Sequence, residues 1–264
     1  MQAAPPVDLW LLPCAAPAAR SLLAEAGGVL DAQEQARAAR MHFTADRDRC
    51  ALARLVLRTV LARYAPIAAR DWRFETNAYG KPALAPGQAP HLCFNLSHAR
   101  EAILLAVGAG CELGVDIEAT SRAAPLDVAD HYFAASEAQA LRALPPSLQH
   151  DRFFDLWTLK ESYIKARGMG LSLPLASFAF SFARDGGLEF SCDAGAARDA
   201  ADRPIRFWQY ALGQQYRAAL CVTGCATAPS LVWHTASDSG WQAGEPPDLR
   251  LLRSTIGANT NFVK

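Results

Sequence analysis

The chain has 264 residues, of which 51% are hydrophobic and 20% are charged, so we expect a globular protein with a sizeable core. Its 26 basic residues balance its 26 acidic residues, and this zero net charge excludes a global field that would recruit nucleic acid or an acidic membrane. No apolar stretch is long enough to span a bilayer, and the N-terminus lacks the basic start of a signal peptide, so a cytoplasmic protein is predicted.

The 7 cysteines are scattered along the chain, and no two of them form a Cys-x-x-Cys pair. This pattern is typical of reduced, mostly buried thiols rather than of a disulfide framework or a zinc site. Cys221 and Cys225 are close in sequence, but they lack the further ligands that a zinc ion requires.

Residues 1–110 are predicted to form an N-terminal α+β half. A short strand over 7–12 precedes an alanine-rich helical region over 16–40, which we expect to break at Gly27-Gly28. Apolar residues recur at helical spacing over 46–64, which predicts a helix buried on one side. Strands are expected at 72–76, 92–96 and 102–107, with Tyr79–Pro82 as a loop between the first two.

Residues 111–225 are predicted to form a second α+β half. It starts with a strand over 113–118, continues with helical segments over 127–144, and has a long helix over 151–167 that Gly168 ends. Strands are expected at 178–182, 188–192, 205–212 and 216–223, with a hairpin turn at 185–187 between the first two.

Each half therefore combines a long helix with antiparallel strands, although no residue-level repeat relates the two. Residues 226–264 mix proline, glycine and serine with isolated tryptophans, and are expected to be a tail of uncertain order.

Two carboxylates lie on one face of a predicted buried strand. Asp116 and Glu118 are two positions apart, and alternate side chains of a strand share a face. Burying both without a partner would be costly, so we expect a cation between them. In the alternative interpretation the strand ends here, Glu118 is solvated, and Asp116 caps the following turn.

A third carboxylate and an ammonium lie on the long helix. Glu161 and Lys165 are one helical turn apart and could form an ordinary surface ion pair. The neighbouring Trp157 and Ile164 are not typical of a solvated face, which favours a functional pair. Three carboxylates and an ammonium suit a hard divalent cation and a phosphorylated substrate.

Further candidate residues lie in the first half. Ser97 and His98 follow a predicted strand; they are not expected to be a nucleophile and its base, because adjacent residues seldom reach each other and no Gly-x-Ser-x-Gly turn is present. They suit the role of donors to a phosphate, the alternative being a locally bonded loop histidine. Lys81 lies between Gly80 and Pro82, where its ammonium could be held in place or simply exposed.

Basic residues cluster near the first long helix, at Arg37, Arg40, Arg47 and Arg49. Helical spacing puts Arg49 on the same side as the apolar Leu52 and Val56, so it is the more suggestive arginine for an anion site.

Taken together, these segments resemble the 4'-phosphopantetheinyl transferases of the large, monomeric Sfp type. The resemblance covers roughly residues 35 to 225, in the same order. It is carried by Tyr79-Gly80-Lys81-Pro82, Phe94-Asn95-Leu96-Ser97-His98, Gly114-Val115-Asp116-Ile117-Glu118 and the segment from Phe154 to Ala166 that contains Trp157-Thr158-Leu159-Lys160-Glu161, followed by Gly168-Met169-Gly170. One departure is Ala99, where relatives often carry a second serine.

The resemblance implies an α+β pseudo-dimer of two similar halves that binds coenzyme A between them. It implies Mg²⁺-dependent transfer of the phosphopantetheine arm to a serine of an acyl or peptidyl carrier protein, with release of 3',5'-ADP. By the same resemblance, Asp116, Glu118 and Glu161 would hold Mg²⁺. Glu161, or a water that it orients, would be the general base, and Lys165 would act on the leaving phosphate.

The resemblance also assigns the coenzyme A contacts. Lys81, Ser97 and His98 would bind its phosphates, Arg37 and Arg49 would lie near its 3'-phosphate, and Asp116 and Lys165 would lie near its pyrophosphate. The role of Lys160 stays open. Two other hypotheses are a different Mg²⁺-dependent phosphoryl-transfer enzyme and a non-catalytic module that binds coenzyme A or carrier domains. The second is disfavoured because a binding module has no need of three metal ligands and Lys165.

Overall fold

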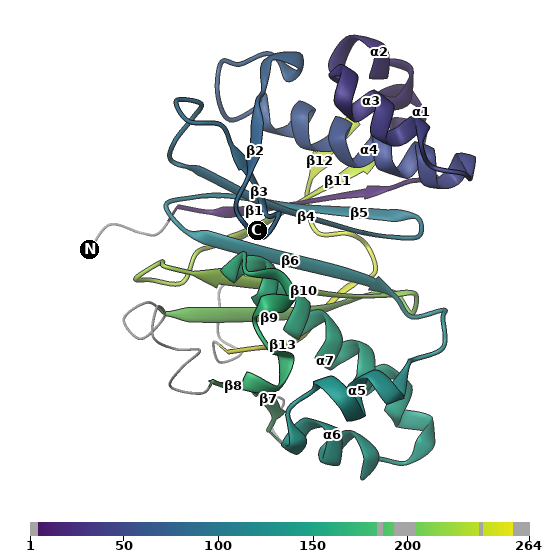
Figure 1. The fold of residues 1–264 in the computed structure, drawn as a ribbon, viewed down its shortest axis with the longest axis vertical. Coiled ribbons are helices and arrows are strands. Elements are labelled where there is room, and N and C mark those ends of the chain that lie inside the picture. The colour runs from purple at the N-terminus through teal and green to yellow at the C-terminus, as the bar shows by residue number, and fades with distance from the viewer. Residues whose placement is uncertain (1–4, 184–186, 193–203, 238–239, 256–264) are drawn as a thin grey trace.

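The computed structural model describes residues 5–183, 187–192, 204–237 and 240–255, and they form four layers (Figure 1). Helices of the first half cover one sheet, helices of the second half cover another, and the two sheets face each other. This arrangement confirms the predicted α+β fold with two similar halves. In the described part of the chain, no helix is long and apolar enough to cross a membrane.

The first half contains a five-stranded sheet of order β12-β11-β1-β5-β4. Its strands from the first 110 residues are β1 (Val7–Pro13), β4 (Leu92–Ala99) and β5 (Ala102–Ala109), which pair antiparallel. The loop that carries Lys81 lies between the strands of a separate hairpin, β2 (Phe74–Thr76) and β3 (Pro82–Leu84).

The helices that cover this sheet are α1 (Pro17–Ala24), α2 (Ala26–Val29), α3 (Ala32–Ala39) and the long α4 (Thr44–Leu61), followed by a 3-10 turn, η1 (Ala69–Asp71). The expected break at Gly27-Gly28 is wrong, because both glycines lie inside the single turn of α2. The chain instead leaves the helix at Leu30 and restarts at Asp31, whose side chain accepts a hydrogen bond from the backbone N–H of Glu34.

The second half contains a four-stranded antiparallel sheet of order β13-β9-β10-β6. Its predicted strands are β6 (Glu112–Ala119), β9 (Ile205–Leu212) and β10 (Tyr216–Thr223). A separate hairpin is formed by β7 (Phe178–Phe182) and β8 (Leu188–Cys192); the expected turn at 185–187 lies mostly outside the described residues.

The helices of this half are α5 (Leu126–Tyr132), α6 (Ala135–Arg142) and the long α7 (Pro146–Arg167), with 3-10 turns η2 (Gly170–Ser172) and η3 (Leu175–Ser177). Helix α7 begins at Pro146, because proline is well suited to the first helical position. It ends at Gly168, whose φ of 64° only glycine adopts without strain, as predicted.

The described residues among 226–255 correct the expectation of a tail of uncertain order, whereas residues 238–239 and 256–264 of the predicted tail lie outside the described part of the chain. The described residues form β11 (Leu231–Ser237), β12 (Gly240–Ala243) and β13 (Leu249–Ser254). Strand β11 pairs parallel with β1 in the first sheet, and β13 pairs antiparallel with β9 in the second. This segment therefore belongs to both halves, and its parallel pair was not expected in a fold predicted to be antiparallel.

Alternation along β1 and β5 divides their apolar side chains between two cores. Leu9, Leu11 and Leu104 point into the core between the sheets, whereas Trp10 and Leu105 point toward α4. Both strands are thus buried on both faces, which explains their nearly continuous apolar sequence.

Strand β6 lies at the meeting point of the two halves. One edge pairs with β10, and the backbone N–H groups of the other edge are bonded by side chains of β4. The N–H of Val115 donates to Asn95 Oδ1 at 2.8 Å, and that of Ile117 donates to Ser97 Oγ at 3.4 Å. Side chains therefore connect β4 to β6 where the first sheet ends and the second begins.

Gly114 brings α7 onto β6. A Cβ atom at this position would lie 1.9 Å from Ser162 O and 2.3 Å from Ala166 N, which no real structure tolerates. Only glycine therefore lets the helix approach closely enough to bring Glu161 and Lys165 over the strand that carries Asp116.

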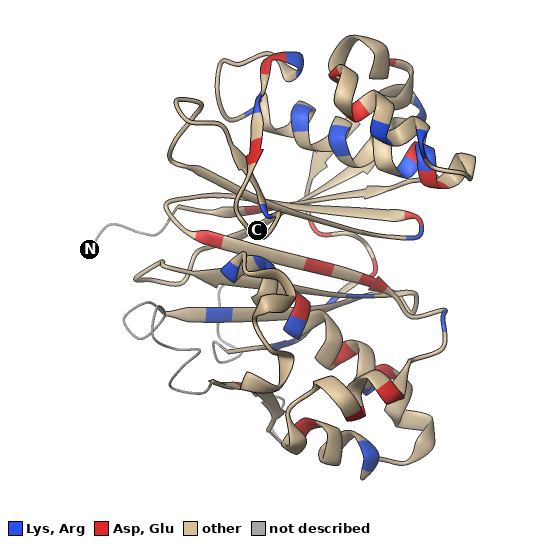
Figure 2. Ribbon diagram, viewed as in Figure 1, with Lys and Arg blue, Asp and Glu red and all other residues tan. Residues whose placement is uncertain are grey.

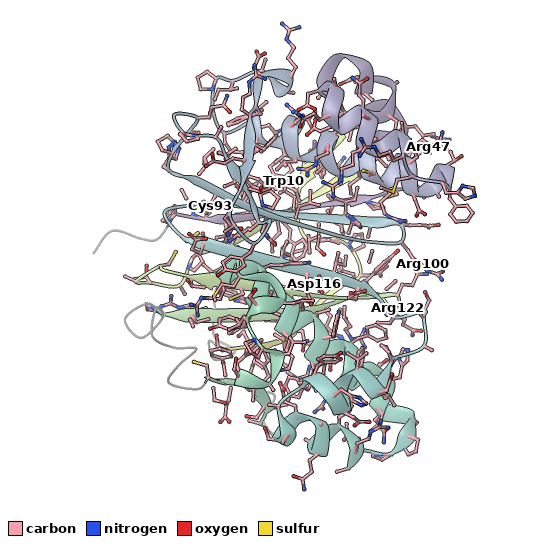
Figure 3. The ribbon with its side chains drawn as sticks, viewed as in Figure 1. Trp10, Arg47, Cys93, Arg100, Asp116 and Arg122 are labelled. Atoms are coloured by element: carbon pink, nitrogen blue, oxygen red, sulfur yellow. The ribbon has the colours of Figure 1, made fainter. Side chains whose placement is uncertain are left out.

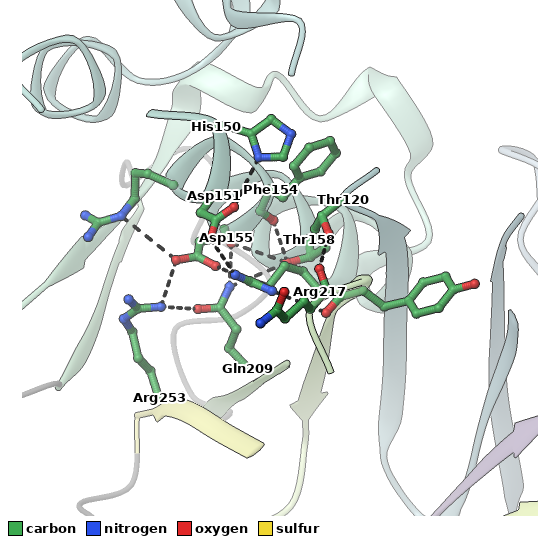
Figure 4. Close-up of polar contacts among 12 residues, drawn as sticks. Thr120, His150, Asp151, Phe154, Asp155, Thr158, Gln209, Arg217 and Arg253 are labelled. Atoms are coloured by element: carbon green, nitrogen blue, oxygen red, sulfur yellow. Dashed lines mark hydrogen bonds and ion pairs between the residues drawn. The ribbon is translucent and has the colours of Figure 1, made fainter. Parts of the chain in front are cut away.

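A buried polar network holds the middle of α7 against the sheet (Figure 4). Asp155 accepts hydrogen bonds at 3.1 Å from both Arg217 of β10 and Arg253 of β13. Gln209 of β9 donates to the backbone carbonyl of Asp155 at 2.6 Å. The carboxylate is paired on two sides, so its burial is compensated, and the register of α7 on three strands is fixed.

Candidate functional site

A cleft of about 770 Å³ lies between α4 and α7, and its floor is made by β4 and β6. Eight of the nine predicted site residues line it: Arg37, Arg49, Ser97, His98, Asp116, Glu118, Glu161 and Lys165. Figure 2 shows how charge is distributed around the cleft: acidic residues lie along β6 and basic residues lie along α4. Both halves of the chain therefore contribute walls to one cleft of mixed charge.

Asp116 lies on β6 in the floor of the cleft and is only 3% exposed. Figure 3 shows it between the two halves. Its Oδ1 atom accepts hydrogen bonds from Lys165 Nζ at 2.5 Å and from Ser97 Oγ at 2.9 Å. Lys165 Nζ also donates to Ser97 Oγ at 2.9 Å. Asp116 Oδ2 is buried and has no hydrogen-bond partner among the described residues. Strand β6 continues to Ala119, so the alternative interpretation, in which the strand ends here and Asp116 caps the following turn, is excluded.

The other two carboxylates flank Asp116. Glu118 accepts hydrogen bonds from Trp157 Nε1 at 3.0 Å and from Arg122 at 3.1 Å. Burial, and then the charge of Asp116, raise the pKa of Glu118. Burial raises the pKa of Glu161 to about 6, the charges of Asp116 and Glu118 add to this rise, and Lys165 opposes it. These shifts show that the three carboxylates repel one another across a partly dry space.

The basic wall comes from the first half. Arg49 donates to the backbone carbonyl of Arg100 at 3.2 Å and pairs with Asp46. Burial, followed by the charges of Arg49 and Lys165, lowers the pKa of His98. His98 is therefore neutral at physiological pH, with one ring N–H available as a donor.

Lys81 is the predicted site residue that the structure does not bring to the cleft. Its Nζ donates to the backbone carbonyl of Ala166 at 2.8 Å and pairs with Glu112 at 3.1 Å. In the same loop, Asn77 Nδ2 donates to the carbonyl of Gly168 at 2.7 Å. The loop satisfies carbonyls at the end of α7, so it fastens the first half to the second.

Lys160, whose role the sequence left open, lies outside the cleft. Its side chain is fully buried, and Nζ pairs with Glu137 at 2.6 Å. It also donates to the carbonyls of Leu175 and Phe178, both at 2.8 Å. These bonds tie α7 to α6 and β7, and the role of Lys160 is therefore structural.

Sequence reasoning gave no role to several residues at the site. The sequence does not indicate a functional role for Asn95 or Arg122, because an amide in a strand and an arginine in a loop usually have structural roles. Trp157 was noted only as an unusual neighbour of Glu161, although its indole N–H holds Glu118. Its spacing of one helical turn from Glu161 was the signal that it faces the same cleft.

In the part of the chain that the structure describes, no three His, Cys, Asp or Glu side chains already surround a point where they could hold a metal ion. The donor set nevertheless fits a hard divalent cation in its chemistry. All three side chains are carboxylates, they repel one another, and one buried oxygen of Asp116 has no hydrogen-bond partner among the residues that the structure places.

Comparisons with known proteins show the family of the chain. A family model of the 4'-phosphopantetheinyl transferase superfamily matches residues 112–221, and a model of the N-terminal part of 4'-phosphopantetheinyl transferase matches residues 16–109. The solved Chronobacterium ammoniagenes ACPS-CoA complex aligns with 44% of this chain and 98% of its own, with a TM-score of 0.36 and 17% identity.

Two curated relatives are similar over most of their length. The 4'-phosphopantetheinyl transferase Sfp of Bacillus subtilis is 31% identical over 189 residues, which is 72% of this chain and 80% of that protein. The 4'-phosphopantetheinyl transferase HetI of Nostoc sp. is 34% identical over 168 residues, covering 63% of this chain and 70% of that protein. As its motifs predicted, the chain belongs to the 4'-phosphopantetheinyl transferase superfamily.

Proposed function

We propose that this protein transfers the 4'-phosphopantetheine group of coenzyme A to a serine hydroxyl of an apo-acyl or apo-peptidyl carrier protein and releases 3',5'-ADP. Membership of the family supports this reaction. The observation that carries the proposal is the buried Asp116, whose Oδ2 has no partner in the described part of the chain and which lines a cleft with acidic and basic walls. A substrate with several phosphates, accompanied by a cation, complements both walls.

The basic wall would bind the phosphates of coenzyme A. Arg37 and Arg49 line this wall and carry permanent charges, and the neutral His98 offers a single N–H donor. Ser97 is already bonded to Asp116 and Lys165, so its hydroxyl is oriented before the substrate binds. Lys81 is left out of this set because its ammonium is engaged at the end of α7.

Asp116, Glu118 and Glu161 would hold Mg²⁺. When bound, Mg²⁺ would neutralise the pyrophosphate and orient it for in-line attack. Lys165 neutralises Asp116 in the described structure, and its ammonium can then pass from the carboxylate to the substrate phosphate. Asp116 would therefore exchange one cationic partner for another when the substrate complex forms.

Glu161 and Lys165 would carry out the two proton transfers of the reaction, one at the attacking serine and one at the leaving phosphate. The carrier serine Oγ would attack the phosphorus of the phosphopantetheine group, and the bond from that phosphorus to the oxygen of the leaving 3',5'-ADP would break. Glu161, with a pKa of about 6, is ionised at neutral pH and basic enough to accept the serine proton directly or through a water. Lys165, one turn along α7, would stabilise or protonate the leaving phosphate.

The test is incubation of the protein with coenzyme A, Mg²⁺ and a panel of apo-acyl and apo-peptidyl carriers, followed by intact-mass analysis. We expect a mass gain of one phosphopantetheine group on at least one carrier, with equimolar 3',5'-ADP. Release of 3',5'-ADP without a gain in carrier mass would favour a different phosphoryl-transfer reaction. Absence of both products would contradict the proposal.

Asp116→Asn tests the acidic centre. We expect the rate of transfer to fall by a factor of at least about 10², because the amide keeps the shape of the carboxylate but loses its charge. The thermal transition should stay close to that of the wild type, and Asp127→Asn, an exposed substitution on α5, is the matched control. Wild-type transfer by Asp116→Asn would remove Asp116 from the proposed metal site.

The protein is further proposed to act as a monomer, because a single chain supplies both walls of the cleft. Light scattering combined with size exclusion should give one mass close to 28.5 kDa. An obligate dimer would contradict this.

A further inference from the structure

Two cysteine sulfur atoms touch at the junction of the two halves, outside the cleft. Cys93 lies in β4 and Cys111 lies just before β6, and their Sγ atoms are 3.3 Å apart. Figure 3 shows Cys93 well separated from Asp116 along the sheets. All 7 cysteines of the chain lie in described residues and are free thiols. No part of the proposed transfer reaction uses this pair.

The backbone brings the two sulfur atoms together. Cys93 is directly opposite Gly108 in the β4–β5 ladder, and the chain then turns at Gly110, where φ is 65°. The N–H of Gly110 donates to the carbonyl of His91 at 3.0 Å, which folds Cys111 back over β4. A Cβ atom at Gly108 would lie 3.2 Å from Cys111 Sγ, so the missing side chain leaves room for the sulfur.

We infer that Cys93 and Cys111 form an oxidisable dithiol that closes to a disulfide across the β4–β6 junction. The S–S bond is about 2.0 Å long, so the sulfur atoms need to approach by roughly 1.3 Å, a movement that small side-chain rotations supply. Both side chains are only half-buried and can be reached by a small oxidant. The co-reactant is a peroxide, and hydrogen peroxide is the probe.

The two sulfur atoms have different roles in this reaction. Either thiol can donate the hydrogen bond between the two sulfur atoms. The contact with the Cys111 thiol and a hydrogen bond from the Cys111 backbone lower the pKa of Cys93, whereas the contact with Cys93, burial and the nearby Cys225 raise the pKa of Cys111. Cys93 is therefore the sulfur that forms the thiolate and reacts first. Cys111 keeps its proton and is positioned to react second.

The steps balance. The Cys93 thiolate attacks one peroxide oxygen, the O–O bond breaks, and the departing hydroxide takes up a proton to form water, leaving a sulfenic acid on Cys93. The Cys111 sulfur then attacks the sulfenic sulfur, the S–O bond breaks, and a second water leaves. Two thiols lose two electrons in total, and one hydrogen peroxide becomes two waters.

The first test is peroxide treatment of the full chain, alkylation of the remaining thiols and peptide mapping. We expect one intramolecular Cys93–Cys111 disulfide, loss of two of the 7 thiols, and reversal by dithiothreitol. Cys93→Ser should keep Cys111 alkylatable, whereas Cys192→Ser, a substitution in β8, should oxidise like the wild type. Retention of both thiols, or a disulfide between Cys111 and Cys225, would overturn the assignment.

A second variant separates the two steps without depending on the disulfide. In Cys111→Ser the second step is blocked, so peroxide should leave a sulfenic acid on Cys93 that dimedone labels. Dimedone labelling of Cys93 should be at least tenfold weaker in the wild type. Labelling of another cysteine in place of Cys93 would refute its role as the reacting sulfur.

The bond should also be visible in the stability of the protein. It joins residues 18 positions apart and so reduces the freedom of the unfolded chain. We expect the oxidised wild type to unfold several degrees above the reduced form, and the difference to disappear in Cys93→Ser. An unchanged midpoint in a fully oxidised sample would show that the bond does not tie the junction.

Discussion

At the scale of single residues, the position of Glu161 disfavours the charge of its carboxylate. It lies with Asp116 and Glu118 in one cleft, and its pKa is raised to about 6 by burial and by these two carboxylates. In the unfolded chain the same group ionises near its ordinary, lower pKa. Between about pH 4.5 and pH 6 the folded protein therefore keeps a proton on Glu161 that the unfolded chain has lost. The contribution of this group to the free energy of unfolding falls as pH rises through that range.

Glu161→Gln removes this charge and should stabilise the metal-free protein above pH 6. The gain in thermal midpoint should be clear at pH 8 and small at pH 5, because the wild-type carboxyl is largely protonated at the lower pH. Thermal unfolding in EDTA measures it, with the exposed Glu25→Gln as the control. An equal gain at both pH values would show that the effect is packing rather than charge.

Among the elements, α7 supplies the proposed general base and the proposed phosphate-binding ammonium, and its position depends on Gly114. The helix supplies Trp157, Glu161 and Lys165 to the cleft, and its backbone rests directly on β6. Gly114→Ala would force the two elements apart, and we expect it to lower the free energy of unfolding by about 3 kcal/mol.

Chemical denaturation checks this prediction. Gly27→Ala is the control, because no atom lies within 4 Å of the Cβ that it would add. If Gly114→Ala were as stable as the wild type, the close approach of α7 to β6 would be wrong.

The end of α7 depends on Lys81, which gives a test of its revised role. Lys81→Met removes the hydrogen bond to Ala166 and the ion pair with Glu112 but keeps the apolar part of the side chain beside Gly168. We expect a loss of about 1 kcal/mol in the free energy of unfolding and a KM for coenzyme A within twofold of the wild type.

Denaturation and steady-state kinetics measure the two effects, with the exposed Arg70→Met as the control. A large rise in KM at unchanged stability would return Lys81 to the coenzyme A site, as the motif resemblance had predicted.

At the scale of the whole molecule, residues 226–255 complete both sheets. Strand β11 pairs with β1, and β13 pairs with β9. A chain that ends at residue 225 should therefore lose cooperative unfolding, because two edges with buried neighbours become unpaired. Circular dichroism during urea denaturation checks this, with a chain ending at residue 255 as the control. Cooperative unfolding of the shorter chain would contradict the structural role of these strands.

The sequence predicted what depends on local spacing. Strand alternation put Asp116 and Glu118 on one face, and one helical turn put Glu161 beside Lys165; these residues do share a cleft, although their chemical roles stay predictions. It did not predict that the Lys81 ammonium reaches the carbonyl of Ala166, because the motif does not say which groups lie near it. It also failed for β11, whose partner β1 is more than 200 residues away and leaves no local signal.

The parallel pairing of β1 with β11 has a consequence for synthesis of the protein. Along the chain, β1 to β5 belong to the first half and β6 to β10 to the second. Strands β11 and β12 then return to the first sheet, and β13 returns to the second. A ribosome releases residues in order, so the first sheet cannot finish folding until residue 243, the end of β12, has emerged. By then, most of the second half is already outside. The two halves must therefore mature together, and their final closure should be slow, as is usual for contacts between distant residues.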